Sequence, residues 1–321
     1  MKIVITGGAG FIGSQLGYYY AKIGNEVHLV DDFSYGHEDN LDIEGEKFGV
    51  VHELDVRNEK IEDVISGAEI VIHLAGIAPL PDCQVDPQKA YSVNVGGLAS
   101  VLEACRKKCV PRILFASTSA VYENTPKKQS GYDEAAVVNP DITYAMTKYA
   151  AEGLCHSYNK NYGMSIAILR FFNVYGPHQD FLRNQPPFTG YVAKCLANDE
   201  APTLYNDSLA ERDYIYVDDL ISLVIKIANK IDKKGIYNIG SGVGFSVPKL
   251  YQIFLEVSGK NIKPLYKNPC HYWDKYPSLH NSNYPFSISR ISQEVHKESI
   301  ANMSKSESEF GWKPSFTIKE G

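Results

Sequence analysis

The sequence lacks the features that mark several classes of protein. Its 321 residues contain no block of lysines or arginines and carry a formal net charge of −6, whereas a nucleic acid or an anionic membrane surface requires a concentrated basic surface. The apolar run at the amino terminus is short and is interrupted by glycines from position 7 onward, which fits neither a signal peptide nor a membrane span. We therefore expect a cytoplasmic protein with no nucleic-acid partner and no membrane partner.

Cysteine is also sparse and shows no ligand pattern. There are six cysteines, with no CxxC pair and no His-rich neighbourhood. A zinc site needs Cys or His ligands at short spacing, and a chain of this length needs no disulfides to hold its core. We therefore expect reduced thiols and no metal. The remaining composition, 44% hydrophobic and 22% charged, is typical of a globular chain with one large or two small domains.

The first half of the chain alternates between two patterns. Short apolar, β-branched runs, each typical of a buried parallel strand, occur at residues 3–5, 27–30, 49–51, 70–74, 113–115 and 166–169. Amphipathic stretches long enough for crossover helices lie between them, at about 11–24, 59–66, 88–108 and 142–162. This alternation predicts an α/β fold, a Rossmann-type doubly wound parallel sheet with helices on both faces.

From about residue 176 the alternation loosens and prolines become frequent. We expect residues 1–175 to form the dinucleotide-binding domain and residues 176–321 to form mainly a smaller substrate-binding lobe. The runs 214–217 and 236–239 still have strand character, so we expect the sheet to receive strands from about 212–242. The chain stops where a final helix could begin, which leaves open whether the carboxyl end is complete.

A glycine-rich turn follows the first predicted strand. Gly7, Gly10 and Gly13 allow a tight turn, a close approach to phosphates and packing of helix on strand, and Phe11 and Ile12 open the helix. The free N–H groups and the positive dipole end of that helix favour a pyrophosphate. The alternative is a plain turn without a ligand.

An acidic pair ends the next predicted strand, and its first member, Asp31, lies 18 residues beyond Gly13. A carboxylate there accepts hydrogen bonds from the ribose hydroxyls of NAD and repels the 2′-phosphate of NADP. Residues 32–37 contain no Arg or Lys that would favour that phosphate. The cofactor predicted is therefore NAD; a helix cap is the alternative role for Asp31.

Tyr144 and Lys148 lie four residues apart in a predicted helix, a spacing that places both on one face. A free tyrosine titrates near pH ~10, and a neighbouring cation, joined by the positive nicotinamide ring, lowers that value. The YxxxK spacing also arises by chance in a chain with 22 tyrosines. The strand at 113–115 runs into the hydroxyl-bearing segment that contains Thr118, however, and such strand ends face the ligand crevice.

Motifs in a fixed order extend this pattern almost end to end: ITGGAGFIG at 5–13, VDDFS at 30–34, HLAG at 73–76, STSAVY at 117–122, YAMTK at 144–148, RFFNVYGP at 170–177, RDYIYVDDL at 212–220, YNIGSG at 237–242 and GWKP at 311–314. In this combination the chain resembles the NAD-dependent epimerase/dehydratase family of extended short-chain dehydrogenase/reductases, which act on nucleotide-activated sugars. The resemblance implies that Tyr144 and Lys148 are catalytic and that Thr118 hydrogen-bonds the sugar hydroxyl that is oxidised.

The resemblance also implies binding residues. Beyond the glycine-rich turn, the cofactor contacts that it implies are Asp31, Asp55, Val56, Leu74, Ala75 and Asn94. The sugar-nucleotide contacts that it implies are Asn173, Arg212 and Arg290. Arginine suits a diphosphate because its planar fork binds two oxygens at once. A surface ion-pair cluster with Glu211 and Asp213 is the alternative role for Arg212.

The residues after Thr118 bear on the reaction. In the family's 4,6-dehydratases the matching Thr is followed by an Asp-Glu pair that loses water from the sugar, and the decarboxylases usually carry a Glu nearby, but Ser119 and Ala120 stand here. The remaining machinery predicts a 4-epimerase, in which Tyr144 takes the proton of the 4-hydroxyl, NAD takes the hydride from C4, and the hydride returns to the other face of the 4-keto sugar.

The sugar is predicted from Ser299. This residue matches a position where a bulky side chain narrows the pocket of epimerases restricted to unsubstituted hexoses, so a small Ser leaves room for a 2-acetamido group. A polar loop residue is the alternative. Glu123, where the family usually has Gly, and the segment 181–189 depart from a typical galactose epimerase. We expect a hexose of the UDP-GlcNAc or UDP-glucose type, with the base undecided among uridine, thymidine, guanosine and cytidine.

Other functions remain open. One is a nucleotide-sugar dehydrogenase, reductase or dehydratase acting on a UDP-, dTDP-, GDP- or CDP-sugar. Another is a non-catalytic NAD-binding regulator, against which the joint presence of Thr118, Tyr144 and Lys148 counts, because a binding module has no use for an activated phenol. The stretches 88–108 and 142–162 resemble the helices by which family members pair into a four-helix bundle, so we expect a homodimer.

Overall fold

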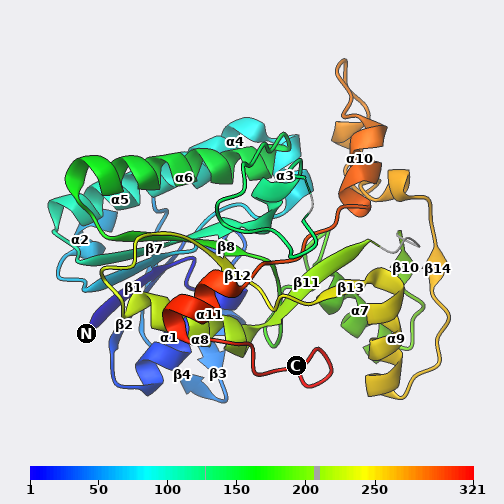
Figure 1. Cartoon of the computed structure of the whole chain (residues 1–321), viewed down its shortest axis with the longest axis horizontal. Coiled ribbons are helices and arrows are strands. Elements are labelled where there is room, and N and C mark those ends of the chain that lie inside the picture. Colours follow the sequence, from blue (N-terminus) through cyan, green and yellow to red (C-terminus); the bar gives the residue numbers. More distant parts are fainter. Residues whose placement is uncertain (127, 206–209) are drawn as a thin grey trace.

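A computed structural model describes residues 1–126, 128–205 and 210–321. In this part of the chain seven parallel strands form a central sheet in the order β12-β8-β7-β6-β1-β2-β5. The strands are β1 (Lys2–Thr6), β2 (Glu26–Asp31), β5 (Val50–Glu53), β6 (Ile70–His73), β7 (Arg112–Thr118), β8 (Ile166–Phe171) and β12 (Gly235–Ile239). Helices cover both faces of the sheet (Figure 1), which confirms the predicted Rossmann-type fold.

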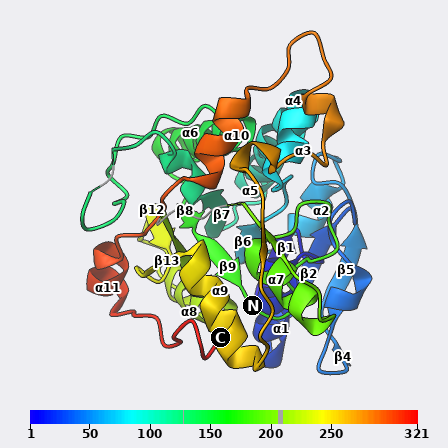
Figure 2. The same cartoon turned by 90° about the vertical axis from the view of Figure 1, so that its right-hand side faces the viewer.

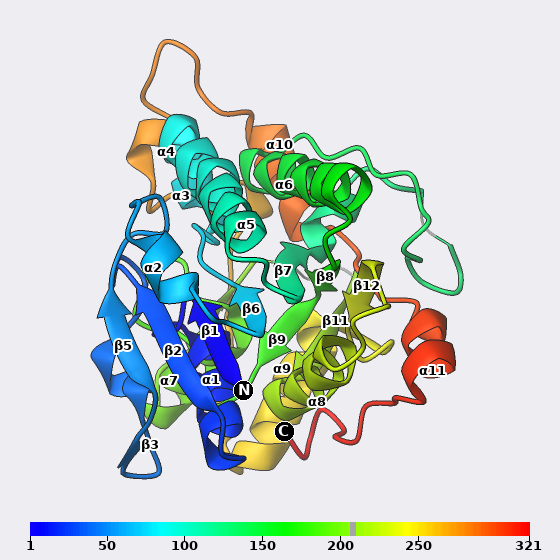
Figure 3. The same cartoon turned by 90° about the vertical axis from the view of Figure 1, so that its left-hand side faces the viewer.

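The sheet divides the core into two layers because successive side chains of a strand point to opposite faces. In β1, Ile3 and Ile5 pack on one side with Leu16 of α1 (Phe11–Lys22). Val4 packs on the other side with Leu98 of α5 (Gly97–Lys107). Figure 3 shows the two layers: α1 and α8 (Val217–Ala228) lie below the sheet, and α2 (Ile61–Ile65), α5 and α6 (Thr143–Tyr162) lie above it.

Most predicted helices form where the amphipathic pattern placed them. The stretch 88–108 is divided, however, into α4 (Pro87–Tyr91), a π-helix η2 (Ser92–Gly96) and α5. Shorter elements in this half are α3 (Leu80–Val85), β3 (Asp42–Ile43), β4 (Glu46–Lys47) and the 3₁₀ turns η1 (Glu38–Leu41) and η3 (Ser119–Tyr122).

The remaining elements build a lobe beside the carboxyl ends of the sheet strands. Its strands are β9 (Asn173–Tyr175), β10 (Thr203–Leu204), β11 (Glu211–Tyr216), β13 (Gly244–Ser246) and β14 (Leu265–Tyr266). Its helices and turns are α7 (Phe188–Ala197), α9 (Val247–Ser258), η4 (Pro269–His271), η5 (Pro277–Leu279) and α10 (Ile288–Val295), and α11 (Ser304–Phe310) follows on the sheet side. Figure 2 views this lobe, with α7 and α9 below and α10 above.

One predicted strand lies elsewhere than expected. The run at 214–217 ends as β11, which pairs with β9 and β13 in a separate three-stranded sheet, and Val217 already begins α8. The run at 236–239 does return, as edge strand β12 beside β8. A short apolar run predicts a strand from its own pattern, but its pairing partner depends on the whole fold.

Two further observations concern the chain as a whole. All six cysteines are free thiols. Within the described ranges, none of the helices combines the length and the apolar character that crossing a membrane requires.

Candidate active site

A cavity of about 460 Å³ lies where the carboxyl ends of β1, β6 and β7 meet the lobe. Open α/β sheets bind their ligands at this edge. The walls come from the glycine-rich turn, the strand ends, the start of α6 and lobe segments. Of the predicted site residues, those that line the cavity are Gly7, Gly10, Phe11, Ile12, Gly13, Leu74, Thr118, Tyr144, Lys148, Asn173 and Arg212.

The glycine-rich turn is shaped so tightly that side chains are excluded from it. Gly7 has a φ of 73°, and a Cβ on it would lie 2.8 Å from the backbone nitrogen of Ala75. A Cβ on Gly13 would lie 2.1 Å from the carbonyl oxygen of Gly7. Gly10 is the N-cap residue of α1, and no side chain caps this end of the helix. The unused N–H groups at this end therefore face the cavity and fit the pyrophosphate of a dinucleotide.

Asp31 ends β2 beside this turn, and its carboxylate is held in place by the backbone. Its two oxygens accept hydrogen bonds from the N–H of Ala9 and of Phe33, both at 2.9 Å. A Cβ on Gly36 would approach Asp31 Oδ1 to 2.8 Å. Burial raises the pKa of this carboxyl, and the two backbone hydrogen bonds oppose the rise. The position fits a ribose contact, although Asp31 is not among the cavity residues given above.

Asp55 and Val56 lie behind the turn. Asp55 forms an ion pair with Arg57, a cation that the sequence reasoning had not considered. Arg57 also donates to Ser92 Oγ at 2.8 Å, so its guanidinium is engaged within the chain. Val56 is buried, and its side chain would be 2.9 Å from a Cβ on Gly97.

Ala75 and Asn94 stand close to the cavity in different ways. Ala75 packs against Gly7, as its backbone distance shows. The buried Asn94 side chain accepts the N–H of Ile77 at 2.7 Å and donates to Ile77 O at 3.1 Å and to Thr147 Oγ1 at 3.0 Å. Asn94 thus ties the segment after β6 to helix α6, a positioning role that the resemblance had not implied.

Thr118, Tyr144 and Lys148 converge in the cavity. Tyr144 occupies the first turn of α6, and Lys148 follows one turn later on the same face. The Lys148 ammonium donates to the carbonyl of Ala116 at 2.9 Å and lies 5.1 Å from the centroid of the Phe115 ring. Thr118 ends β7, and its Oγ1 accepts the N–H of Ala120 at 3.1 Å.

Burial dominates the titration of this group. It raises the pKa of Tyr144 to about 12 and lowers the pKa of Lys148 to about 8. A hydrogen bond with Thr118 and the charge of Arg183 lower the pKa of Tyr144 against the effect of burial. We had expected this effect from Lys148, but its ammonium is turned to the Ala116 carbonyl. Arg183, which lines the same cavity, escaped the sequence analysis.

Helix α6 is anchored beneath these residues by a buried ion pair. Glu152, one further turn along, accepts hydrogen bonds from Arg170 Nε at 2.9 Å and Nη2 at 2.7 Å. Its Oε1 also accepts from Ser117 Oγ at 2.5 Å. The side chains of Glu152 and Arg170 are 2% and 3% exposed, so water does not screen the pair.

On the lobe side, Asn173 and Arg212 line the cavity. Asn173 donates to the carbonyl of Asp213 at 2.8 Å. The Arg212 guanidinium donates to the carbonyls of Glu294, Val295 and Lys297 at the end of α10. These backbone partners replace the surface ion-pair cluster that was the alternative for Arg212.

Two predicted substrate contacts lie outside the lining. The Arg290 guanidinium forms ion pairs with Glu123 and Asp141 instead of facing the cavity. Ser299 is 5% exposed, and its Oγ lies 3.5 Å from Ser119 Oγ, next to Thr118. Arg290 is held away from the cavity by three carboxylates, those of Glu123, Asp141 and Glu294, whose proximity the spacing along the chain does not reveal.

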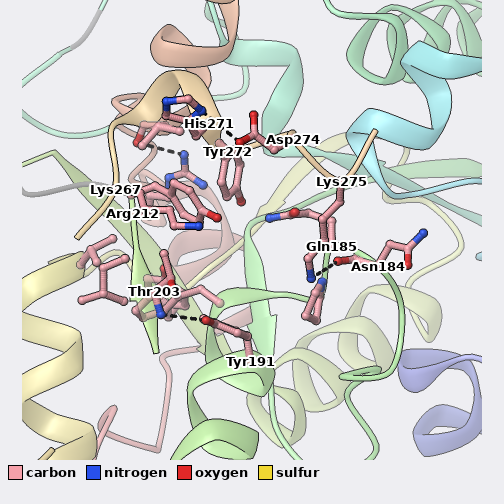
Figure 4. Close-up of a pocket in the computed structure, with 17 residues that line it drawn as sticks. Asn184, Gln185, Tyr191, Thr203, Arg212, Lys267, His271, Tyr272, Asp274 and Lys275 are labelled. Carbon is pink, nitrogen blue, oxygen red and sulfur yellow. Dashed lines mark hydrogen bonds and ion pairs between the residues drawn. The ribbon is translucent and has the colours of Figure 1, made fainter. Parts of the chain in front are cut away.

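A second cavity, of about 270 Å³, opens in the lobe (Figure 4). It shares Arg212, Tyr214 and Tyr272 with the first cavity, so the two adjoin. Its basic side chains, Arg212, Lys267, His271 and Lys275, outnumber its acid, Asp274. Its aromatic side chains are Phe188, Tyr191, Tyr205, Tyr214 and Tyr272. Apart from the density of Tyr and Lys at 266–275, no sequence pattern indicates this cavity.

Known proteins share this architecture. The model of the NAD dependent epimerase/dehydratase family matches residues 3–240. An uncharacterized UDP-glucose epimerase of Bacillus subtilis is 30% identical over 313 residues, covering 94% of each chain. The UDP-glucose 4-epimerase of Thermotoga maritima, solved with UDP-glucose, superposes with a TM-score of 0.87 at 27% identity, covering 100% of this chain and 96% of its own. The UDP-N-acetylglucosamine 4-epimerase of Methanobrevibacter ruminantium, solved with UDP-N-acetylmuramic acid, gives 0.85 at 25% identity, covering 99% and 96%.

Proposed function

The chain belongs to the NAD-dependent epimerase/dehydratase family, and from this premise we propose that it epimerises C4 of a nucleotide-activated hexose of the UDP-N-acetylglucosamine or UDP-glucose type. The observation that carries the proposal is the convergence of Thr118, Tyr144 and Lys148 in one cavity with the glycine-rich turn. The enzyme uses NAD, as its family does, and acts on a nucleotide sugar.

The proposed roles follow from the geometry. The turn at Gly7, Gly10 and Gly13 holds the pyrophosphate of the cofactor, and Asp31 holds the adenosine ribose. When bound, the nicotinamide accepts the hydride of C4 and returns it. Tyr144 accepts the proton of the 4-hydroxyl and later gives it back, while Thr118 holds that hydroxyl by a hydrogen bond. Lys148 lies one turn from Tyr144 on the same face of α6 and donates to the Ala116 carbonyl, and we propose that it completes the catalytic group.

Leu74, Ala75, Asp55, Val56 and Asn94 remain proposed cofactor contacts; Leu74 lines the cavity, and Asn94 is held by its hydrogen bonds to Ile77.

The second cavity suits the nucleoside diphosphate. The cations of Arg212, Lys267 and Lys275 can neutralise the two phosphates, and Arg212 lies where both cavities meet. The rings of Tyr205 and Tyr272, with centroids 5.3 Å apart, offer an apolar surface for the base. The sugar then lies in the first cavity, between Asn173 and the catalytic group.

The residues after Thr118 favour epimerisation over dehydration. Neither Ser119 nor Ala120 carries a carboxylate that could remove a proton from C5. A specific observation keeps a dehydratase or a net oxidoreductase as the second candidate: Glu294 lines the cavity from the lobe side with a buried carboxylate, whose Oε2 makes no hydrogen bond and lies 3.9 Å from both Arg290 Nη1 and Lys297 Nζ.

We assign the preference for a 2-acetamido sugar to Ser299. Its side chain is small and stands beside Ser119, which follows the catalytic Thr118. A tyrosine in place of Ser299 would extend toward Ser119 and Thr118, into the space proposed for the 2-acetamido group.

We further propose that the enzyme is a cytoplasmic homodimer. The six free thiols suit a reducing compartment. The exposed tyrosines Tyr91, Tyr149 and Tyr162, at 39%, 44% and 57%, lie on α4 and α6, the elements expected to pair.

The test is turnover without added cofactor. Purified protein is incubated with UDP-N-acetylglucosamine and, separately, with UDP-glucose, and the sugar products are followed by proton NMR. We expect the galacto epimers to accumulate to an equilibrium ratio, faster for the acetamido sugar. A product that has lost water or gained an oxidised carbon, or a yield limited to one equivalent per enzyme, would support the second candidate instead.

A further inference from the structure

Glu123 stands where the family usually has Gly. Its side chain is buried beside the catalytic helix α6. It follows η3, which continues from the end of β7 where Thr118 stands. Its carboxylate oxygen Oε1 accepts the N–H of Ile142 at 2.8 Å and the N–H of Asp141. Ile142 is the N-cap of α6, and its own side chain forms no capping hydrogen bond. Glu123 thus holds the two residues that lead into the helix in whose first turn Tyr144 lies.

The other carboxylate oxygen of Glu123 binds a residue of the lobe. Glu123 Oε2 pairs with the Arg290 guanidinium of α10, which also donates through Nε to Asp141 Oδ1 at 2.9 Å. The Glu123 and Arg290 side chains are 2% and 15% exposed. One guanidinium therefore binds two carboxylates at the start of α6, and this contact joins the lobe to the catalytic helix.

Helix α10 extends the link to the substrate side. Its last residues, Glu294 and Val295, provide carbonyls to which the guanidinium of Arg212 donates. Arg212 lines both cavities. Contacts thus run from Asp141 and Ile142, just before Tyr144 in the chain, through Glu123, Arg290 and α10 to Arg212.

We propose that Glu123 and Arg290 form a positioning pair. The pair fixes the distance between Tyr144 and the lobe, which binds the nucleotide. The inference rests on the proposed function, because it concerns the efficiency of that reaction. The physical reason is that catalysis requires the reacting atoms within a narrow range of distance, and a shift of about 1 Å can cost about 10²-fold in rate. Neither residue touches the reacting atoms in this scheme.

The experiment breaks the pair from each side. Glu123→Gln keeps the shape and one acceptor for the backbone N–H groups but removes the negative charge, and Arg290→Gln removes the positive charge. We expect each variant to lower kcat about tenfold with NAD still bound, because the glycine-rich turn lies outside the link. We expect the double variant to be no slower than the slower single variant, since both changes remove the same contact. Arg290→Lys, which restores the charge, should recover part of the rate.

A matched control is Glu309→Gln. Glu309 pairs with Lys233 at 3.0 Å, with side chains 25% and 36% exposed, away from both cavities. It should leave kcat unchanged at a similar melting temperature. Unchanged kcat in Glu123→Gln and Arg290→Gln, a double variant whose loss is the product of the two single losses, or no recovery in Arg290→Lys would overturn the proposal.

Failure of the proposed function gives a different result. If the wild-type enzyme turns over none of the nucleotide sugars, the positioning pair is tested by hydrogen exchange of the amides of residues 141–147. Faster exchange in Arg290→Gln than in Glu309→Gln would support the link between α10 and α6. Equal exchange in the two variants would refute it independently of any activity.

Discussion

Replacing Tyr144 by phenylalanine removes the phenol hydroxyl and leaves the other groups of the site in place. The ring is 9% exposed and stays in place, so no cavity is created. The lost hydrogen bond with Thr118 has a net value of about 1 kcal/mol, and Thr118 Oγ1 keeps the N–H of Ala120 as a partner at 3.1 Å. We therefore expect the free energy of unfolding to change by no more than about 1 kcal/mol.

The effect on turnover should be far larger. A positioned general base contributes about 10²- to 10⁴-fold, which corresponds to about 3 to 5 kcal/mol in the barrier. The assay is epimer formation by proton NMR, with bound NAD quantified after denaturation. Tyr158→Phe is the matched control, because Tyr158 lies on the same helix as Tyr144 but its hydroxyl donates to Glu103 of α5 at 3.4 Å, outside the cavity. Tyr144→Phe turnover within tenfold of wild type would refute the role assigned to the phenol.

Three further predictions concern selectivity, pH and stability. Ser299→Tyr should slow the acetamido sugar more than tenfold relative to UDP-glucose, and an unchanged rate ratio measured by NMR would contradict the pocket assignment. Burial raises the pKa of Tyr144 to about 12; because the base must be deprotonated and is still mostly protonated at about pH 9, kcat should rise with pH throughout the range from about 6 to 9, and a flat profile would exclude this base. Glu152→Ala leaves the buried Arg170 unpaired and should lower the free energy of unfolding by about 3 to 5 kcal/mol in urea titrations, whereas a loss below about 1 kcal/mol would show that the pair is screened.

Local patterns carried the predictions that succeeded. Ile3–Ile5 alternates between two core layers, and the glycines at 7 and 13 leave no room for a Cβ, so both features follow from short local sequence patterns. The spacing of Tyr144 and Lys148 places both on one helical face in the same way. Such properties depend on nearest neighbours along the chain.

The site residues that were not predicted come together only when the lobe folds. Arg183, Lys267 and Lys275 come from separate loops, and no spacing brings them to the cavities. Arg290 was expected at the diphosphate, but Glu123 and Asp141 lie closer to it and neutralise it. β11 was expected in the central sheet because its apolar pattern does not encode which strand it pairs with.

The ion pair that anchors α6 limits which insertions this helix can accept. Tyr144, Lys148 and Glu152 recur at every fourth position of one helix, and the last of them is fastened to Arg170 of β8. One residue inserted between Tyr144 and Glu152 would rotate the two ends by about 100° relative to each other. The helix could then satisfy the ion pair or present the phenol, but not both. The number of residues between Tyr144 and Glu152 is therefore constrained by the ion pair with Arg170 as well as by the reaction.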